Sequence, residues 1–510
     1  MRKWMPLIAI SLGTFMLLVD VTIVNVALPD MADDLSTSFS SLQWVIDIYA
    51  LVLAALLLGS GTIADRVGHR RIYVVGLIMF AAASLVSGLA PNSGVLIAAR
   101  GLQGIGGAAM FATTFALLNS SYTGRDRGVA YGIWGAIGGA AAAVGPIAGG
   151  LLTQNFSWRW IFYVNLPISV LAVVMCMMVL TGGDSRRKTR LDLAGMISFT
   201  VAAAALTYGL IRANDDGWAS AGTLGMVVLA AIALVAFVLV ELRAVAPMFD
   251  LALLRHGPFV GALVAGLAMN FAAFAYLAYS SVWLQSVLGL GPVKAGVVGA
   301  LPLAVTAFLT SAIAGRFLHG DKSRAAIGGG LLLIGVGGLV EAYQLHSTAD
   351  WHALLVGLAI SGVGVGLAAP ALSSTAMGAV PLQRGGMAAG AVNTARQLGF
   401  ALGIAVLGSV FAARAQHSLG GASLTDAAGQ AKAIAGGQAQ QIVAHVPEGS
   451  RQHVATVVRA AATSGLQGTV LVAGVCGVVA AVITVGLLGK PQSAKHESPA
   501  VDGDLAAAAT

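Results

Sequence analysis

Four ionisable side chains stand inside long apolar runs of this sequence: Asp20, Asp47, Arg100 and Arg396. A charge inside a hydrocarbon layer is costly, so such residues are candidates for transport, proton relay or buried ion pairs. Counting about 1.5 Å per residue from the expected outer helix ends places Asp20, Asp47 and Arg100 at a common depth of about 8 to 12 Å. Burial and a second carboxylate favour the protonated form of an Asp, whereas a guanidinium favours the carboxylate. We therefore expect Asp20 and Asp47 to exchange a proton and Arg100 to tune that exchange, with a static ion pair that holds the first, second and fourth helices together as the alternative.

The other intramembrane charges point less clearly to transport. Arg396 lies about ten residues into its helix, with no obvious acidic partner in the C-terminal part of the chain. We expect it to bond backbone carbonyls and hold helices together, or alternatively to meet a substrate oxygen. Glu341 and Glu241 fall near expected helix ends, where long side chains can extend to the interface. We assign neither of them a transport role.

The elements that position these residues follow from composition. Hydrophobic residues make up 57% of the 510 positions and charged residues only 10%, whereas soluble proteins have ~45–50% and ~25%. Apolar runs long enough to span a bilayer, ~20 residues each, recur throughout the chain. We predict an all-α membrane protein with fourteen transmembrane helices, which start near residues 7, 42, 72, 94, 129, 160, 193, 221, 258, 295, 326, 353, 386 and 464.

The distribution of positive charge predicts the orientation. The formal net charge is +7, but the basic residues are scattered through short loops, which argues against a nucleic-acid partner. Nineteen of the 28 Lys and Arg residues fall on the side of the N-terminus, whereas the short loops of the other side hold only Arg159, Arg212 and Lys294. Such a bias places the basic side in the cytoplasm. We expect a multi-pass protein of the cytoplasmic membrane with both termini inside.

An internal repeat is visible at an offset of 258 residues. Gly104 and Gly106 match Gly362 and Gly364, and further glycines of the following helix match at the same offset. The repeat predicts two six-helix pseudo-repeats with the seventh and eighth helices inserted between them, and a binding site near the midplane between halves that rock against each other. The predicted domains are an N-terminal bundle (1–181), the inserted helices (182–257), a C-terminal bundle (258–490) that includes an outer loop (413–463), and a disordered cytoplasmic tail (491–510).

A loop motif stands between the second and third predicted helices. Glycines suit a tight turn, and an acidic residue can pair with neighbouring bases and cap a helix, as a cytoplasmic latch that breaks on reorientation. Alternatively, the basic residues only fix topology. The residues of the motif are Gly61, Asp65, Arg66, Gly68, Arg70 and Arg71. This pattern resembles the loop signature of the major facilitator superfamily.

Three further stretches form motifs, namely Leu18–Pro29, Arg100–Gly104 and a glycine-rich motif in the fifth predicted helix. They narrow the resemblance to the fourteen-helix drug:proton antiporter family of that superfamily, which often has another Gly where this sequence has Ala141. By this resemblance Arg100 takes part in proton transfer, and the fifth-helix motif marks an antiporter. The small residues of this motif permit close helix packing that would seal the cavity against proton leak. Alternatively, they serve only ordinary helix packing. The motif residues are Gly145, Pro146, Gly149 and Gly150.

Polar and aromatic residues of the predicted spans are candidates for lining a substrate cavity. With apolar walls and few charges, such a cavity favours lipophilic ligands, including cationic ones attracted by Asp20 and Asp47. The candidates are Asn25, Trp44, Gln103, Asn270, Tyr276, Asn393, Arg396 and Gln397.

We therefore expect a proton-coupled antiporter that exports lipophilic drugs or antibiotics. No Gly-x-x-x-x-Gly-Lys-Ser/Thr loop is present, so a proton gradient is the expected energy source, with no cofactor or metal. A dedicated exporter or an uptake symporter for one natural product or metabolite is the alternative. A membrane enzyme or sensor is disfavoured because no metal-binding His cluster or nucleophile elbow is visible. The expected partners are small lipophilic molecules, protons and membrane lipid, with the protein as a monomer.

Overall fold

The computed structural model describes residues 2–37, 39–180, 192–317, 322–381, 384–420 and 426–489, so the predicted tail (491–510) lies outside the described residues. The N-terminal half consists of α1 (Met5–Asp34), α2 (Phe39–Val67), α3 (His69–Gly88), α4 (Ser93–Ser121), α5 (Gly124–Asn155), α6 (Trp160–Tyr163) and α7 (Asn165–Val179). The inserted helices are α8 (Leu193–Asp216) and α9 (Ala221–Arg243). The C-terminal half consists of α10 (Gly257–Met269), α11 (Leu277–Val282), α12 (Pro292–Phe317), α13 (Ser323–Gln344), α14 (His352–Gly378), α15 (Gly385–Gly420), α16 (Ala427–Ala435), α17 (Ala439–Ala444) and α18 (Glu448–Leu487).

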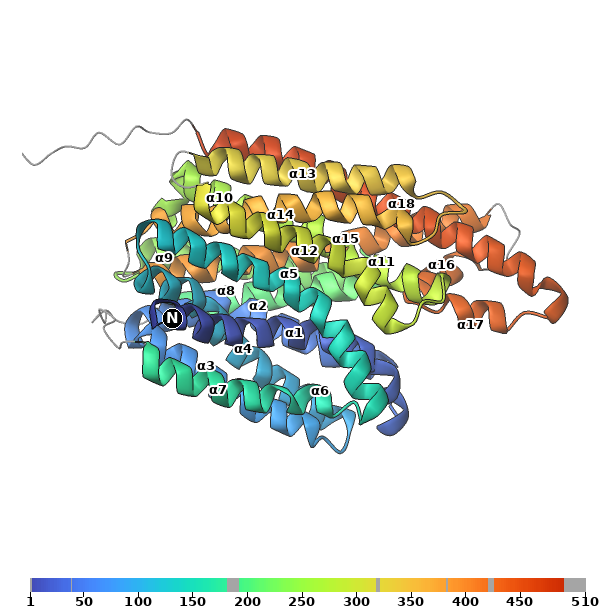
Figure 1. Cartoon of the computed structure of the whole chain (residues 1–510), viewed down its shortest axis with the longest axis horizontal. Helices are drawn as coiled ribbons and strands as arrows, with labels where there is room; N and C mark the ends of the chain where they lie inside the picture. The colour runs from blue at the N-terminus through green and yellow to red at the C-terminus, as the bar shows by residue number, and fades with distance from the viewer. Residues whose placement is uncertain are drawn as a thin grey trace, which may run out of the picture.

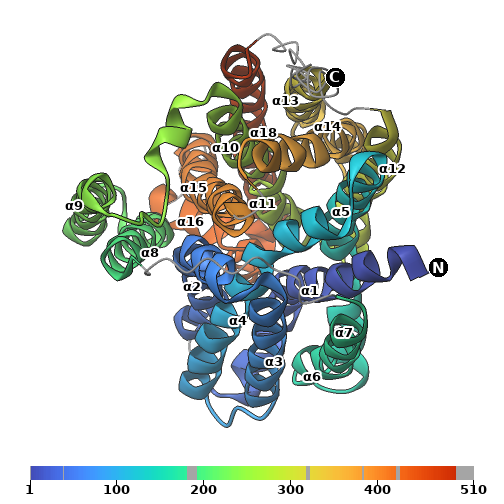
Figure 2. The same cartoon turned by 90° about the vertical axis from the view of Figure 1, so that its left-hand side faces the viewer.

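These helices form one elongated bundle (Figure 1). Thirteen helical segments in the described part of the chain are long and apolar enough to cross a membrane. α5 is the fourteenth, because its 32 residues run through the bundle and pack along α12 and α1 (Figure 2). We call the end of the bundle at which α1 begins the inner end, and the opposite end the outer end. The prediction of an all-α membrane protein with fourteen spans is confirmed.

The observed helix starts lie within five residues of the predicted ones, with one exception. α18 begins at Glu448 and not near residue 464, and α15 continues to Gly420. Both helices extend past the apolar spans because the flanking sequence is rich in Ala and other helix formers. The stretch expected as an outer loop (413–463) is therefore mostly helical in its described residues, with α16 and α17 between the two long helices at the outer end (Figure 1).

The two halves of the bundle repeat one close helix contact. In the N-terminal half, Gly76 of α3 faces Gly106 of α4, and a Cβ on either would strike the carbonyl oxygen of the other. In the C-terminal half, Gly330 of α13 and Gly364 of α14 face each other in the same way. Glycine is required at such positions because only its missing side chain lets two helix backbones approach this closely. Gly106 and Gly364 are one of the residue pairs that revealed the repeat.

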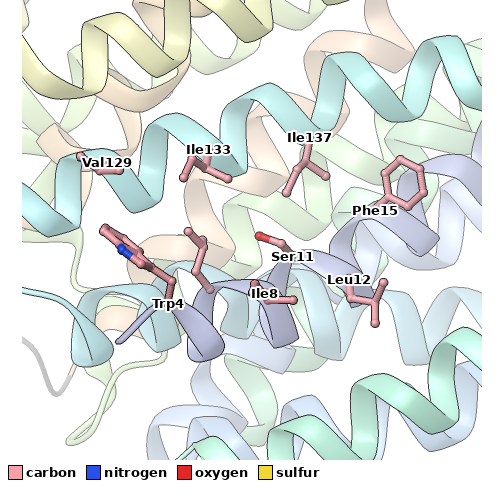
Figure 3. Close-up of a pocket in the computed structure, with 9 residues that line it drawn as sticks. Trp4, Ile8, Ser11, Leu12, Phe15, Val129, Ile133 and Ile137 are labelled. Atoms are coloured by element: carbon pink, nitrogen blue, oxygen red, sulfur yellow. The ribbon is translucent and has the colours of Figure 1, made fainter. Parts of the chain in front are cut away.

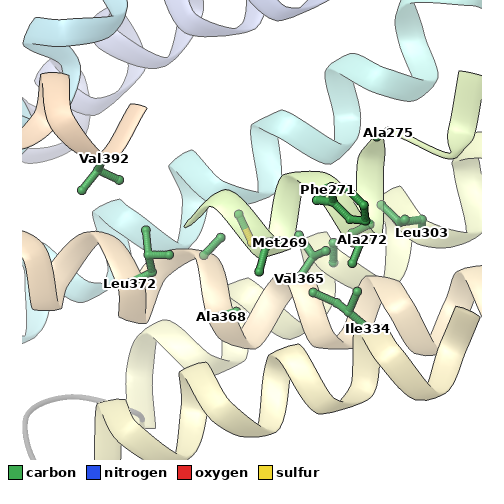
Figure 4. Packing of buried hydrophobic residues seen from close by; sticks show 14 of the residues in the cluster. Met269, Phe271, Ala272, Ala275, Leu303, Ile334, Val365, Ala368, Leu372 and Val392 are labelled. Atoms are coloured by element: carbon green, nitrogen blue, oxygen red, sulfur yellow. The ribbon is translucent and has the colours of Figure 1, made fainter. Parts of the chain in front are cut away.

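Apolar side chains fill the interior of the C-terminal half. Phe271, Leu303, Ile334, Val365 and Leu372 come from four neighbouring segments and are all less than one-tenth exposed (Figure 4). Met, Ala and Val side chains fill the spaces between them. This dense packing fixes how the helices of the half are rotated, and so which polar side chains turn inward.

The inserted helices lie at the side of the bundle, against the seam between the halves. α8 packs on both α2 and α15, and α9 lies outside it (Figure 2). The ring of Tyr208 on α8 lies tilted against the ring of Trp44 on α2, with 5.6 Å between the ring centroids. Trp218, just past the end of α8, donates its Nε1 hydrogen to Ser409 Oγ of α15 at 2.6 Å. α8 therefore covers the seam from outside and contacts both halves.

Candidate functional site

The N-terminal half contains a fully buried ion pair between Asp20 of α1 and Arg100 of α4. The two side chains are 0% and 1% exposed, and Arg100 Nη1 donates to Asp20 Oδ2. Arg100 Nε donates to the Val45 carbonyl of α2 at 2.9 Å. The guanidinium also lies 4.4 Å from the ring centroid of Tyr49. The structure thus brings together two of the three residues that we expected to take part in proton coupling, and α2 contributes a carbonyl and a ring to the same site.

Two amide side chains and a hydroxyl complete the surroundings of Asp20. Gln103 Nε2 and Asn165 Nδ2 both donate to Asp20 Oδ1, at 2.9 and 3.0 Å. The same two amides donate to Ser84 Oγ at 2.8 and 3.2 Å. Gln103 Oε1 accepts from Arg100 Nη1 at 2.8 Å, which orients the amide toward the carboxylate. We call Asp20, Ser84, Arg100, Gln103 and Asn165 the Asp20 network.

Every described partner of the Asp20 carboxyl is a hydrogen-bond donor. A carboxylate can accept such bonds on both of its oxygens. A buried ion pair with complete hydrogen bonding is compensated, and removal of one partner would leave the other charge buried alone. Asp20 and Arg100 therefore depend on each other for charge compensation.

Asp47 stands on α2 between two residues of this site. It is half-buried, and it lies between Val45 and Tyr49 in the sequence. The described hydrogen-bond partners of Asp20 come from α4 and α7, not from Asp47. A role for Asp47 in proton exchange stays a prediction.

The loop motif forms a second site, at the inner end of the bundle. Asp65 is 7% exposed and accepts the backbone amides of Gly386 and Met387 at 2.8 and 2.9 Å. These amides belong to the first turn of α15, where a carboxylate is favoured by free N–H groups and by the helix dipole. His69 Nε2 lies 2.9 Å from Asp65 Oδ1. We call the contact of Asp65 with the first turn of α15 the inner latch.

The glycines and arginines of the motif have distinct environments. A Cβ at Gly61 would strike the carbonyl oxygen of Gly386, so α2 and α15 touch backbone to backbone. Gly68 adopts a φ of 112°, which L-residues rarely tolerate. Arg70 Nη2 donates to the Met177 carbonyl of α7 at 2.8 Å, and Arg66 and Arg71 are exposed. We expected arginines beside Asp65, but the described side-chain partner of Asp65 is His69. His69 was missed, although its spacing of four residues from Asp65 could have indicated it.

The fifth-helix motif lies between the two halves. A Cβ at Gly145 would strike Thr22 Oγ1 of α1, and one at Gly150 would lie 3.1 Å from Val293 of α12. Gly149 is buried, and the side chain of Pro146 lies outside the described part of the chain. The small residues therefore permit close approach on both sides of α5.

The candidate cavity residues are dispersed. Asn393 Nδ2 donates to the Phe111 carbonyl of α4 at 3.0 Å, and the Arg396 guanidinium lies 5.5 Å from the ring centroid of Trp134 on α5. Both contacts join the C-terminal half to the N-terminal half. Asn270 Nδ2 donates to the Gly266 carbonyl of its own helix at 3.1 Å.

The remaining candidates lie away from this junction or outside the described side chains. Trp44 packs on α8, Gln103 belongs to the Asp20 network, and Gln397 is half-buried. The side chain of Asn25 lies outside the described part of the chain. Tyr276 donates its hydroxyl to Glu341 Oε1 at 3.0 Å.

Both glutamates that we expected to reach the interface are buried instead. Glu341 is 0% exposed and Glu241 is 5% exposed. Glu241 Oε2 accepts the Phe249 amide at 3.3 Å, in the segment that follows α9. The expectation was wrong because helix rotation, which the sequence does not reveal, turns both side chains toward neighbouring helices.

Two surface hollows are described, and neither holds the Asp20 network. An apolar groove of about 580 Å³ runs between α1 and α5, with Trp4, Ile8, Phe15, Ile133 and Ile137 among its lining residues (Figure 3). A second hollow of about 750 Å³ lies at the outer end, between α13 and α14.

Comparisons with known proteins agree with this architecture. The chain matches the family model "Major Facilitator Superfamily" over residues 10–404. It superposes on the human organic anion transporter MFSD10 (TETRAN) with a TM-score of 0.62 and 15% identity, covering 94% of this chain and 99% of the other, which supports the fold alone.

Bacterial relatives are more similar in sequence. The chain is 37% identical to multidrug resistance protein Stp of Mycobacterium tuberculosis over 410 residues, which cover 80% of this chain and 76% of Stp. It is 38% identical to puromycin resistance protein pur8 of Streptomyces alboniger over 416 residues, covering 80% and 82%. It is 34% identical to the tetracenomycin C resistance and export protein of Streptomyces glaucescens over 426 residues, covering 81% and 77%. The chain therefore belongs to the major facilitator superfamily, as a cofactor-independent transporter rather than an enzyme, related to drug-resistance and efflux proteins.

Proposed function

We propose that this protein is a proton-coupled antiporter that exports lipophilic drugs or antibiotics, cationic ones included, across the cytoplasmic membrane. The observation that carries the proposal is the Asp20 network, an ionisable pair buried among neutral polar groups in the N-terminal half. The names of the related resistance proteins support export as the direction and drug-like molecules as the cargo.

The net charge of the Asp20–Arg100 pair explains how binding of a proton and binding of a cationic substrate would exclude each other. With Asp20 ionised, the pair with Arg100 is neutral, and with Asp20 protonated it carries one positive charge. A cationic substrate is therefore favoured by the first state and repelled by the second.

Arg100 has partners to hold it after Asp20 is protonated. The Val45 carbonyl, Gln103 Oε1 and the Tyr49 ring all contact the guanidinium independently of Asp20. These contacts lower the cost of releasing the carboxylate, because the guanidinium keeps hydrogen-bond acceptors and a cation–π partner. Proton uptake then becomes a local rearrangement of Arg100 rather than the creation of a wholly unpaired charge.

Antiport also requires a structural element that differs between two states of the protein, and we assign this role to the inner latch. Asp65 on α2 binds the first turn of α15, so the latch joins the two halves at the inner end. Opening of the inner end must break both hydrogen bonds and separate Gly61 from Gly386. We assign the inner end to the cytoplasm because the basic loops lie there, and we take the working unit to be a monomer.

The test is transport by purified protein in sealed liposomes with an imposed pH difference. Puromycin and ethidium are suitable first probes, because both are lipophilic amines or cations. We expect uptake against a gradient by the wild type only when the pH difference is present, and its loss in Asp20→Asn. Asp216→Asn is the matched control, because Asp216 pairs with Arg212 at the surface, 3.1 Å away and far from the network.

A rate that ignores the pH difference in the wild type would overturn the proposal. The same assay distinguishes the alternatives. Export of one compound among many, as the name of the tetracenomycin C exporter suggests for that relative, would indicate a dedicated exporter. Movement of cargo with the proton rather than against it would indicate a symporter.

A further inference from the structure

The C-terminal half contains a buried acid that the Asp20 mechanism does not use. Glu341 of α13 is 0% exposed, and its Oε1 accepts the hydroxyl of Tyr276 at 3.0 Å. Its Oε2 is buried and has no hydrogen-bond partner among the described residues. Tyr276 is also 0% exposed, so the pair is closed off from the surface in this arrangement.

No described cation faces this carboxyl from the helices that pack against α13. α14 presents Gly357, where a Cβ would strike Glu341 Cγ, and Ser361, whose hydroxyl donates to the Ile334 carbonyl. α18 presents Gln467, whose amide donates to the Ala342 carbonyl at 3.0 Å. The α18 cation nearest in sequence to Gln467, Arg459, donates to the Ala349 carbonyl in the outer loop instead. On the α10 side, Tyr276 is the titratable group that meets Glu341.

The position of this cluster matches that of the Asp20 network in the other half. Ser361 lies 258 residues after Gln103, the offset of the internal repeat, and Glu341 lies 257 residues after Ser84. Ser84 and Gln103 bond across α3 and α4. In the other half, Ser361 of α14 bonds to the Ile334 carbonyl of α13, and Glu341 of α13 packs against Gly357 of α14.

One difference separates the two clusters. The residue that lies 258 positions after Arg100 is Leu358, which is fully buried and apolar. The C-terminal cluster therefore has an acid without a counterpart of the guanidinium that pairs with Asp20. A carboxylate sealed in apolar surroundings with no counterion is strongly disfavoured, so Glu341 holds its proton in this arrangement.

Tyr276 lies in an irregular part of its membrane span. It stands between two π-helical segments, Asn270–Phe274 and Trp283–Val287, which interrupt the span that begins with α10. Such wide turns are rare and often occur at functional sites. A register change there would move the Tyr276 hydroxyl relative to Glu341.

We propose that Glu341 is a second proton-carrying group, protonated in the arrangement described here and deprotonated when the span containing Tyr276 shifts and opens Oε2 to water. The O–H bond of the carboxyl breaks and its proton passes to water on one side, and the carboxylate later takes a proton from water on the other side. The inference rests on the proposed antiport function and extends it. In each transport cycle, Asp20 carries one proton in the N-terminal half and Glu341 carries one in the C-terminal half.

The first test measures the protonation of Glu341 directly and needs no cargo. Infrared spectra of the purified protein in lipid at neutral pH should contain a carboxylic-acid C=O band that Glu341→Gln removes and Asp20→Asn leaves in place. Tyr276→Phe should move that band, because the hydroxyl no longer donates to the carboxyl oxygen. If neither substitution changes a carboxylic-acid band, Glu341 is ionised and the proposal is wrong.

The second test measures stoichiometry with puromycin in proteoliposomes. The quantity measured is the puromycin concentration ratio across the membrane at which net flux stops under a pH difference of about one unit. We expect this ratio to fall about tenfold in Glu341→Gln, because one proton fewer is coupled to each puromycin. Glu241→Gln is the matched control, since it changes another buried acid to an amide outside both halves. If Glu341→Gln fails to fold, Tyr276→Phe replaces it, and the pH dependence of puromycin flux is measured instead. We expect that dependence to differ from the wild type's.

The outcomes separate the two proposals. An unchanged halting gradient in Glu341→Gln, with coupling abolished in Asp20→Asn, overturns the role of Glu341 and leaves the antiport function intact. Flux that ignores the pH difference in the wild type overturns the antiport function itself, whatever the infrared band shows.

Discussion

Gly61 of α2 and Gly386 of α15 face each other so closely that a Cβ on either would strike the backbone carbonyl oxygen of the other. The two residues are more than 300 positions apart and belong to opposite halves of the transporter. Asp65, one helical turn after Gly61, binds the amide of the same Gly386. Backbone contact and helix capping therefore act on one turn of α15, and both must be lost together when the inner end opens.

We first predict that Gly386→Ala shifts the protein toward an open inner end. The added methyl group would collide with the Gly61 carbonyl and with Asp65, and overpacking of this kind costs about 1–3 kcal/mol. In a variant lacking Cys176 and Cys476, a cysteine at position 393 should react faster with a maleimide when Gly386→Ala is present. Gly329→Ala is the control, because a Cβ there meets nothing within 4 Å. Equal labelling in the two alanine variants would contradict the prediction.

A second prediction concerns the cap on α15. Asp65→Ala should lower stability by about 1–2 kcal/mol, because two first-turn amides lose their acceptor, and should also reduce transport. Asp65→Asn should fall between, since its single carbonyl oxygen can still accept one amide. Melting temperature in detergent and initial rates in liposomes measure the two effects.

The matched control for this cap is Asp426→Ala. Asp426 caps the short helix α16 through the Gly429 amide at 3.0 Å, at the outer end. Its loss should leave transport unchanged. Equal losses of transport in both Ala variants would mean that the inner latch has no special role.

Much of the fold could be predicted because apolar length and loop charge are local properties of the sequence. The helix starts followed from where apolar runs begin, and the pairing of Asp20 with Arg100 followed from their shared depth. α18 was placed too short because its outer turns are helical without being apolar, so hydropathy gave no signal there. The depth argument also placed Asp47 near the pair, but depth alone does not say which way α2 is rotated.

The remaining parts of the site depend on contacts between distant segments. Gln103 was expected to line a cavity, but the packing of α4 turns its amide toward Asp20. Asn165 and Ser84 carry no charge, so nothing in the sequence set them apart as partners of that carboxylate. Glu341 shows the same limit: its position near a helix end suggested exposure, whereas the close contact with Gly357 encloses it.

A third prediction is that replacing Arg396 raises the stability of the protein but lowers its transport activity. Its guanidinium stacks on Trp134 and makes no hydrogen bond or ion pair with any described residue. An uncompensated charge between packed helices is destabilising, so Arg396→Met should raise the melting temperature while lowering transport. Arg212→Met, which removes a paired surface charge, should change neither by much. A fall in melting temperature with Arg396→Met would show that the stacking outweighs the cost of the charge.

A final prediction concerns pH and the outer end of α1. The Arg159 guanidinium and the Trp158 Nε1 hydrogen both contact Asp34, and they hold the pKa of that carboxyl below its ordinary value of 3.8. A lowered pKa in the folded state means stabilisation that is fully present above about pH 4 and is lost as the pH falls through the folded-state value. Because the Asp34 side chain is 46% exposed, the effect at neutral pH should be under about 1 kcal/mol.

Asp34→Asn should therefore melt slightly below the wild type at pH 7, and the difference should close as the pH is lowered toward 3. High salt should shrink the difference at pH 7, because ions screen an exposed pair. Arg159→Gln should produce a similar loss, and the double variant should lose less than the two single changes together, since they remove one shared interaction. A difference that stays constant from pH 7 to pH 3 would show that Asp34 acts through packing rather than through its charge.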